Sequence, residues 1–201
     1  MSILRVRPEQ KGNLGAALRQ HRASYIPGSF WKGDKVEATH NDWTITLDVY
    51  IVSAGKTVLQ FTRLRAPYIN PDKFRFTIYR KGVFSGLGKL LGMQDIEVGH
   101  PAFDEAFIIK GTDDAKVRAL FNNARLRELI NLQPDIRLSV KDDEGLFSKR
   151  FPEKVDELEF CVHGIIKDPE RLKLLFDLFA VTLDELCRIG SAYEEAPGVT
   201  L

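Results

Sequence analysis

Five basic side chains are the first candidates for chemistry. They occupy one strand-like segment and both ends of a glycine-rich segment: Arg63, Arg65, Arg80, Lys81 and Lys89. Guanidinium and ammonium groups gathered in this way can form a cationic rim for an anion or an acidic partner. The glycine-rich segment does not fit a phosphate loop, because Val83 replaces the first glycine and Leu90 replaces the magnesium-binding Ser or Thr. We therefore predict ligand or partner binding at the five basic residues and expect no cofactor.

Nucleophiles, bases and metal ligands are the next candidates. Cys161 and His163 share one face of a predicted strand, where they could act as nucleophile and base. No acidic residue stands at a defined spacing to orient the imidazole, which favours a structural pair. The four histidines are scattered through the chain without a paired metal-ligand spacing. We predict neither a catalytic nor a metal-binding residue, although an enzyme assembled from dispersed side chains stays open.

Composition limits the classes of partner and the compartment. The chain of 201 residues carries 29 basic and 28 acidic side chains, so it has no overall field that would hold nucleic acid or an anionic membrane. Its two cysteines form no C-x-x-C pair, which is typical of reduced thiols in a cytosolic protein. No segment has the apolar character of a signal peptide or a membrane span. We therefore expect a cytoplasmic protein that neither binds nucleic acid nor inserts into a membrane.

Alternation of apolar and polar residues predicts the strands that must position these side chains. The clearest strand runs from Trp43 to Ser53, with one buried face and one partly wet face, as in antiparallel sheets. Turn and capping residues separate further strands from two short helices. The other predicted elements are strands within residues 57–65, 74–79, 106–110, 136–140 and 158–166 and helices within residues 112–121 and 124–131.

Two registers are open for the hairpin that follows Trp43 to Ser53. A two-residue turn places Leu64 beside the apolar face, whereas a bulged turn places Phe61 there. We favour the bulged turn, which carries Arg63 and Arg65 to the core side of the sheet. Pro67 is expected to end the second strand, because proline cannot donate to a central ladder.

The last helix, Asp168 to Gly190, has the strongest start signal in the chain. Asp168 suits the N-cap, Pro169 suits the first helical position, and Gly190 suits the stop. Apolar residues cover most of its circumference, so the helix requires burial on more than one side. We predict that it either covers the core or provides a self-association surface, with an interface at Leu174, Leu178 and Val181.

Two strand-to-helix junctions resemble each other and suggest an internal repeat. Ile108-Ile109-Lys110 precedes one capped helix and Ile165-Ile166-Lys167 precedes the other. The predicted fold class is α+β, with a twisted antiparallel sheet, helices packed on one face and, if the repeat is real, two pseudo-symmetric halves. The predicted single domain comprises an arm at 1–33, a first β-rich half at 34–132, a second half at 133–190 and a flexible tail at 191–201.

Three segments together resemble a family. They are Thr62-Arg-Leu-Arg-Ala-Pro-Tyr68, Asp95-Ile-Glu-Val-Gly99 and Phe103-Asp-Glu-Ala-Phe-Ile-Ile-Lys-Gly111. Over about Lys35 to Gly190 the chain resembles uncharacterised bacterial proteins of unknown function that carry an FDxxF strand-to-helix segment. The resemblance implies a bacterial source and supplies no activity. Some members look membrane-anchored, but this sequence shows no such segment, so a membrane role is not carried over.

The FDxxF segment also has a plain physical interpretation. Phe103 and Phe107 are expected to anchor a strand entry in the core, and Asp104 is expected to accept backbone hydrogen bonds. Taken together, the sequence favours a non-enzymatic binding or assembly module whose partner is another protein or a second copy. The alternative is a small-molecule or lipid carrier with an apolar cavity between the sheet and the C-terminal helix.

Overall fold

The computed structural model describes residues 24–26, 35–54, 57–82, 95–142, 151–199 and 201. Lys89 and most of the predicted arm lie outside these residues, whereas residues 24–26 of that arm form a strand. The elements follow one another as β1 (Ser24–Ile26), β2 (Lys35–His40), β3 (Trp43–Ala54), β4 (Thr57–Ile69), β5 (Phe76–Arg80), α2 (Pro101–Ala106), β6 (Phe107–Gly111), α3 (Asp114–Phe121), α4 (Ala124–Asn131), β7 (Arg137–Lys141), β8 (Val155–His163) and α5 (Pro169–Arg188).

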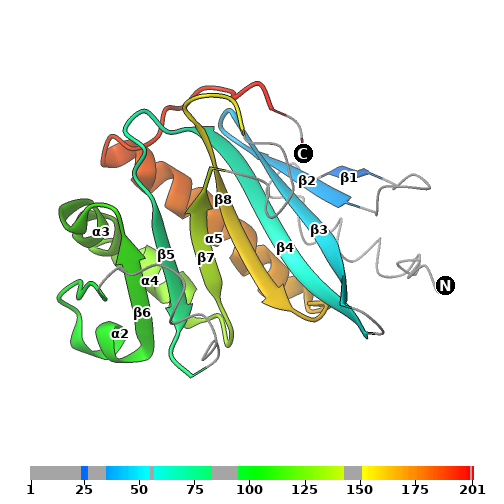
Figure 1. Cartoon of the computed structure of the whole chain (residues 1–201), viewed down its shortest axis with the longest axis horizontal. Helices are drawn as coiled ribbons and strands as arrows, with labels where there is room; N and C mark the ends of the chain where they lie inside the picture. The colour runs from blue at the N-terminus through cyan, green and yellow to red at the C-terminus, as the bar shows by residue number, and fades with distance from the viewer. Residues whose placement is uncertain (1–23, 27–34, 55–56, 83–94, 143–150, 200) are drawn as a thin grey trace.

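The described strands form one eight-stranded sheet in the order β1-β2-β3-β4-β8-β7-β5-β6 (Figure 1). Each pair of neighbouring strands is antiparallel. The predicted α+β class with an antiparallel sheet is therefore confirmed. β7 and β8 insert between β4 and β5, so strands of the two predicted halves are interleaved in the sheet.

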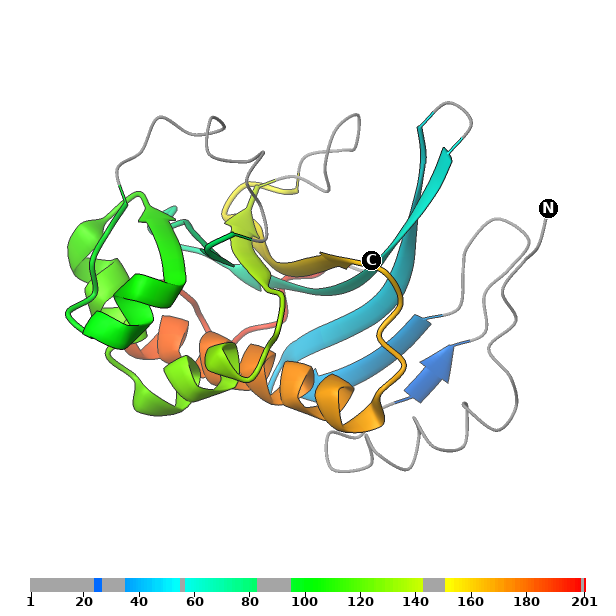
Figure 2. The same ribbon diagram turned by 90° about the horizontal axis from the view of Figure 1, so that it is seen from below.

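The sheet is strongly curved, and α4 and α5 lie along one of its faces (Figure 2). α2 and α3 lie at the end of the sheet beside β6 (Figure 1). A hydrogen bond of 2.8 Å between His40 of β2 and Asp184 of α5 joins the far strands to the last helix. This arrangement leaves the other face of the sheet without a described helix on it.

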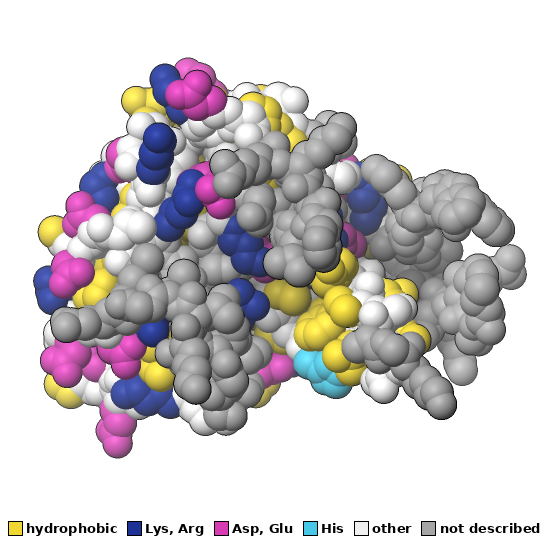
Figure 3. All heavy atoms as spheres, viewed as in Figure 1, with side chains coloured by type: hydrophobic (Ala, Val, Ile, Leu, Met, Phe, Trp, Pro, Cys, Tyr) yellow, Lys and Arg dark blue, Asp and Glu magenta, His cyan; other side chains and the backbone are white. Residues whose placement is uncertain are grey.

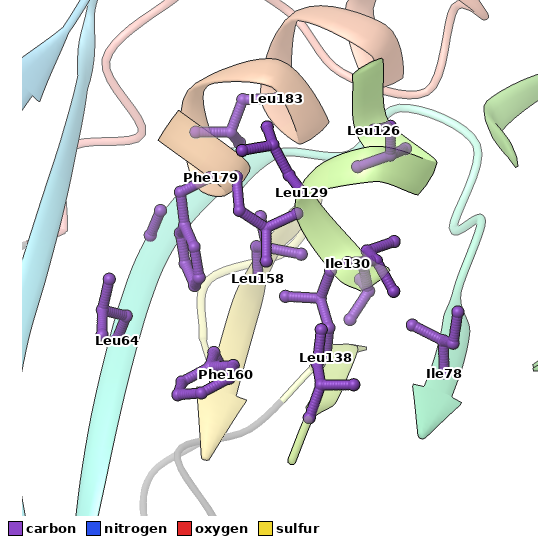
Figure 4. Close-up of a cluster of buried hydrophobic side chains, with 14 of the residues drawn as sticks. Leu64, Ile78, Leu126, Leu129, Ile130, Leu138, Leu158, Phe160, Phe179 and Leu183 are labelled. Atoms are coloured by element: carbon purple, nitrogen blue, oxygen red, sulfur yellow. The ribbon is translucent and has the colours of Figure 1, made fainter. Parts of the chain in front are cut away.

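Apolar side chains fill the space between the sheet and α5. Figure 4 shows Leu64, Phe160 and Leu138 on three neighbouring strands, with Phe179 and Leu183 of α5 above them. All five side chains are fully buried. Burying one such side chain contributes about 2 kcal/mol, so the wide apolar stripe of α5 is used in covering the sheet of its own chain.

The caps of α5 are those that the sequence predicts. The Asp168 carboxylate accepts a hydrogen bond of 3.0 Å from the Glu170 amide, and Pro169 is the first helical residue. Gly190 follows the helix with a φ of +74°, a conformation that glycine adopts without the strain imposed on other residues. The predicted helix from Asp168 to Gly190 is therefore confirmed.

The predicted interface on α5 is largely occupied by the protein itself. Leu178 is fully buried in the core, which is a correction to its placement on a self-association surface. Leu174 and Val181 are partly buried and pack against that core. Self-association through the remaining exposed parts of Leu174 and Val181 stays a prediction.

The hairpin of β3 and β4 adopts the register that we did not favour. Ala54 pairs with Thr57 and Leu47 pairs with Leu64, which is the pairing of a two-residue turn. Leu64 consequently lies in the core, and Arg63 and Arg65 lie on the opposite face. The prediction of a bulged turn was wrong because it considered one hairpin, whereas β4 must also bury Leu64 and Tyr68 while pairing with β8.

Pro67 does not end β4, which continues to Ile69. The pairing of β4 with β3 stops at Arg65, whereas its pairing with β8 continues through Pro67 opposite Glu157. A strand that is paired on one side only can accommodate a residue without an N–H group. The prediction failed because it assumed that β4 has partners on both sides along its whole length.

The FDxxF segment has the predicted roles within a short helix, α2. The Asp104 carboxylate accepts hydrogen bonds of 2.9 to 3.1 Å from the amides of residues 98, 99 and 100. Phe103 and Phe107 are buried, and their ring centroids lie 4.6 Å apart. The segment therefore holds the chain before β6 in place by packing and by three hydrogen bonds from backbone amides to the Asp104 carboxylate.

The second copy of the proposed repeat has the predicted helix, but it lacks the predicted strand. β6 leads into α3, as the first copy requires, but Ile165 to Lys167 lies beyond the end of β8 and belongs to no strand. Gly164, with a φ of +91°, donates its amide to the Gln60 carbonyl at 2.7 Å and turns the chain out of the sheet. The strand assignment for the second copy was therefore wrong.

The predicted flexible tail starts as a packed segment. Ser191 and Ala192 are buried, and the Tyr193 amide donates to the Ile69 carbonyl. The Ser191 hydroxyl donates to Asp72 at 2.9 Å and accepts from Lys116 at 3.0 Å. These bonds tie residues 191–193 to α3 and to the end of β4.

Gly111 lies at a close approach between β6 and α3. A Cβ atom added there would lie 2.4 Å from Val117 Cγ2 and 3.3 Å from the Arg75 carbonyl oxygen. Val117 is fully buried and cannot move aside freely. We expect Gly111→Ala to lower the free energy of unfolding in urea by about 2 kcal/mol. A variant as stable as the parent would contradict this packing.

Candidate functional site

The face of the sheet opposite α5 carries charged and polar side chains at its centre. We call it the polar face and define it by residues of β3, β4, β7 and β8: Asp48, Arg63, Arg65, Ser139, Lys141, Glu157 and Glu159. Pairing holds them side by side, since Glu159 lies opposite both Arg65 and Ser139. Figure 3 shows this side of the molecule, with Lys and Arg side chains in dark blue over the middle of the sheet.

Asp48 is shared by two guanidinium groups. Arg63 donates from Nε and Nη2 to the two carboxylate oxygens at 2.9 and 2.8 Å, and Arg65 donates from Nη2 at 2.9 Å. Burial disfavours the charged form of Arg63, but the hydrogen bond and charge of Asp48 outweigh it and raise its pKa. All three side chains are less than a fifth exposed, so these charge-assisted bonds are strong. Two cations are held by one carboxylate.

Glu157 is a fully buried carboxyl group on the polar face. Burial, with a smaller contribution from the charge of Glu159, raises its pKa to about 8, although Arg65, Arg63 and Lys141 oppose the shift. Arg65 Nη1 lies 3.7 Å from Glu157 Oε2, which is beyond hydrogen-bond distance. At neutral pH Glu157 is therefore mainly a carboxylic acid that can both donate and accept a hydrogen bond.

Three neighbouring groups of the polar face have no hydrogen-bond partner among the described residues. They are the carboxyl oxygens of Glu157, Nε of Arg65 and the hydroxyl of Ser139, and all three side chains are more than nine-tenths buried. An unpartnered buried polar group costs about 1 to 3 kcal/mol. Several such groups at one place require an explanation, and a bound polar group there would provide their missing partners.

The other charged residues of the polar face are paired, and the neighbouring Cys161 and His163 show no sign of catalytic activation. Lys141 forms an ion pair with Glu159. Burial raises the pKa of the neighbouring Cys161 thiol to about 11, so the thiolate that a nucleophile requires is disfavoured. His163 is exposed and packs edge-on against Phe61, with centroids 5.5 Å apart. These features support the structural interpretation of Cys161 and His163.

Aromatic side chains border the polar face on the β3–β4 hairpin. The Arg63 guanidinium lies 4.4 Å from the centroid of the Tyr50 ring, within cation–π distance. Tyr50 also contacts Phe61 at 6.3 Å between centroids, and Tyr50 itself is 43% exposed. The polar centre is therefore adjacent to an aromatic border that a ligand or partner can reach.

The structure divides the five basic residues that the sequence singled out. Arg63 and Arg65 belong to the polar face. Arg80 donates to two backbone carbonyl groups at the end of α4, at 3.1 and 2.9 Å, and Lys81 donates to a carbonyl group of α2 at 2.9 Å. Arg80 and Lys81 thus tie β5 to helices and do not form one rim with Arg63 and Arg65. Lys89 lies outside the described residues.

Sequence reasoning missed the acidic half of the site, Asp48, Glu157 and Glu159, and the two β7 residues Ser139 and Lys141. A signal was present, because charged residues alternate with apolar ones in β3, β4 and β8. With the two-residue turn, Arg63 and Asp48 would have been placed on one face. Nothing local indicated that β8 would lie beside β4.

Comparison with known proteins and a search for special sites complete the description. No protein-family model matches the chain, and neither a curated protein nor a solved structure matches it. Among the described residues, no group of three or more His, Cys, Asp or Glu side chains is placed to hold a metal ion. None of the described helices has the length and apolar character needed to cross a membrane.

Proposed function

We propose that this protein is a binding module that takes a polar ligand on the polar face of its sheet. The observation that carries the proposal is the group of three adjacent, buried and unpartnered polar groups: Nε of Arg65, the carboxyl of Glu157 and the hydroxyl of Ser139. A ligand that supplies partners for them recovers hydrogen-bond energy that the protein alone forgoes.

The surroundings of these groups favour binding at a prepared position. Asp48 fixes Arg65 by a 2.9 Å hydrogen bond, and the ion pair with Lys141 fixes Glu159 between Arg65 and Ser139. Side chains that are held in place lose little entropy when a ligand arrives. Tyr50 offers an accessible ring at the border for the apolar part of a ligand.

Ligand-observed NMR on the full chain tests this proposal. The library contains carboxylates, phosphate and sulfate esters, ammonium compounds, and neutral amides and sugars. We expect at least one class to give saturation-transfer signals with the parent protein. Ser139→Ala should weaken binding of that class by about fivefold, the effect of one neutral hydrogen bond, without loss of stability, since the hydroxyl has no partner among the described residues.

Thr39→Ala is the matched control for Ser139→Ala. Thr39 is exposed on β2 and lies opposite Thr44 of β3, away from β4, β7 and β8. Its removal should leave binding unchanged. A library in which no class binds, or in which both variants bind as the parent does, would contradict the proposal.

The carrier alternative requires an apolar cavity between the sheet and α5. The described side chains there, including Leu64, Phe160 and Phe179, are packed together and fully buried (Figure 4). The unpartnered groups of Arg65, Glu157 and Ser139 lie on the other face of the sheet. We therefore place the ligand on the polar face.

A further inference from the structure

The charges of the polar face are unequal once its ion pairs are formed. Arg63 and Arg65 share Asp48, and Lys141 is paired with Glu159. Apart from Glu157, three cations thus face two carboxylates, which leaves one positive charge in excess. Lys110 of β6 and Arg137 of β7 lie on the same side of the sheet, as their pairing with Thr77 and Tyr79 of β5 shows. Both side chains contribute further positive charge to that side.

The unpartnered groups are mainly donors. Arg65 Nε–H can only donate, and the Ser139 hydroxyl can donate. The protonated Glu157 carboxyl offers a third donor, and burial holds that proton by keeping its pKa near 8 against the opposing charges of Arg65, Arg63 and Lys141. Among the described residues, Glu159 also faces Glu157, and its charge acts in the same direction as burial. Several unpartnered donors on one face that carries an excess positive charge suit an anion.

We propose that the ligand of the polar face is a monoanionic carboxylate, bound by Arg65, Ser139 and a Glu157 side chain that keeps its proton. This inference rests on the proposed function and specifies the ligand class. One carboxylate matches the single excess charge, and Arg65, Ser139 and protonated Glu157 offer it N–H and O–H donors. A cationic ligand would meet Arg63, Arg65 and Lys141, and a dianion would exceed the charge available for pairing.

Binding must then be coupled to a proton. Ionised Glu157 would repel a carboxylate and would offer it no O–H donor. Affinity is therefore constant while Glu157 is protonated and falls as the pH rises above about 8. The limiting slope is about tenfold per pH unit, as expected for one proton.

Acetate is the probe, with acetamide, methylammonium and sulfate as neutral, cationic and dianionic comparisons. Titrations at constant ionic strength, from pH 6.5 to 9.5, follow the Arg65 Nε–H resonance and the amides of β4 and β8 in the full chain. We expect acetate to bind most tightly and to weaken toward tenfold per pH unit above pH 8. Glu157→Gln, which keeps a donor and cannot ionise, should bind acetate within about threefold of the parent at pH 6.5 and show no pH dependence.

Ser139→Ala provides a second variant that leaves the titrating group intact. It should bind acetate about fivefold more weakly at every pH and keep the slope of the parent. An acetate affinity that does not change with pH, or tighter binding of any comparison probe, would overturn the carboxylate inference. Binding of methylammonium or acetamide at these resonances would still leave the binding function standing, whereas a library without any binder removes both.

Discussion

Asp48→Asn will lower the free energy of unfolding by about 3 kcal/mol, as expected when one partner of a buried charge pair is removed. The reason is the shared carboxylate, which accepts from Arg63 at 2.9 and 2.8 Å and from Arg65 at 2.9 Å. Without it two guanidinium groups, each about nine-tenths buried, repel each other and lose the one carboxylate that both contact. Urea denaturation at pH 7 and two salt concentrations measures the change.

Asp184→Asn is the control for Asp48→Asn. Asp184 also accepts a hydrogen bond, from His40 at 2.8 Å, but its side chain is 53% exposed. Exposed pairs contribute about 0 to 1 kcal/mol, so the loss should be small and should shrink in salt. Equal losses in the two variants would show that Asp48 is an ordinary surface charge.

Glu157→Gln will make the protein more stable than the parent above pH 8. The folded-state pKa of Glu157 is raised from its ordinary 4.5 to about 8. Below pH 4.5 folded and unfolded chains both carry the proton, so no stability is lost. Between pH 4.5 and 8 only the unfolded chain ionises, and the parent loses about 1.4 kcal/mol per pH unit. The total loss is on the order of 5 kcal/mol, and a glutamine does not incur it.

The measurement is the difference in unfolding free energy between Glu157→Gln and the parent at pH 5, 7 and 9. Taking the difference removes the effects of all other titrating groups. Glu159→Gln, on the same strand and face, is the control, since it deprives Lys141 of its partner and should be less stable than the parent at all three pH values. A difference for Glu157→Gln that stays constant from pH 5 to 9 would rule out the buried proton.

Local sequence signals determined much of the fold. The Asp168 and Pro169 start of α5, the break at residues 122–123 between α3 and α4, and the alternation of β3 all appear in the structure at the predicted places. Asp104 caps the segment before β6 as its spacing suggests. Each of these features depends on residues within a few positions of one another, so the chain carries the information locally.

Only the arginines of the candidate site could be predicted from the sequence, because the site depends on contacts between distant segments. Alternation placed Arg63 and Arg65 on one side of a strand, but a slip of one residue in the turn exchanges the two faces. The two-residue register turned both arginines from the core to the polar face. Their expected neighbours Arg80 and Lys81 instead bind carbonyl groups of the helices, where β5 ends.

By itself, then, the sequence determined which residues share a strand face, where α5 starts and stops, and that Arg63 and Arg65 lie together. The tertiary structure alone decided that β8 lies between β4 and β7 and so brings Glu157 beside Arg65 and Ser139. The physical reason is the distance along the chain over which each interaction acts. Periodicity and capping act within one element, whereas strand order follows from burying every apolar face at once, including that of α5.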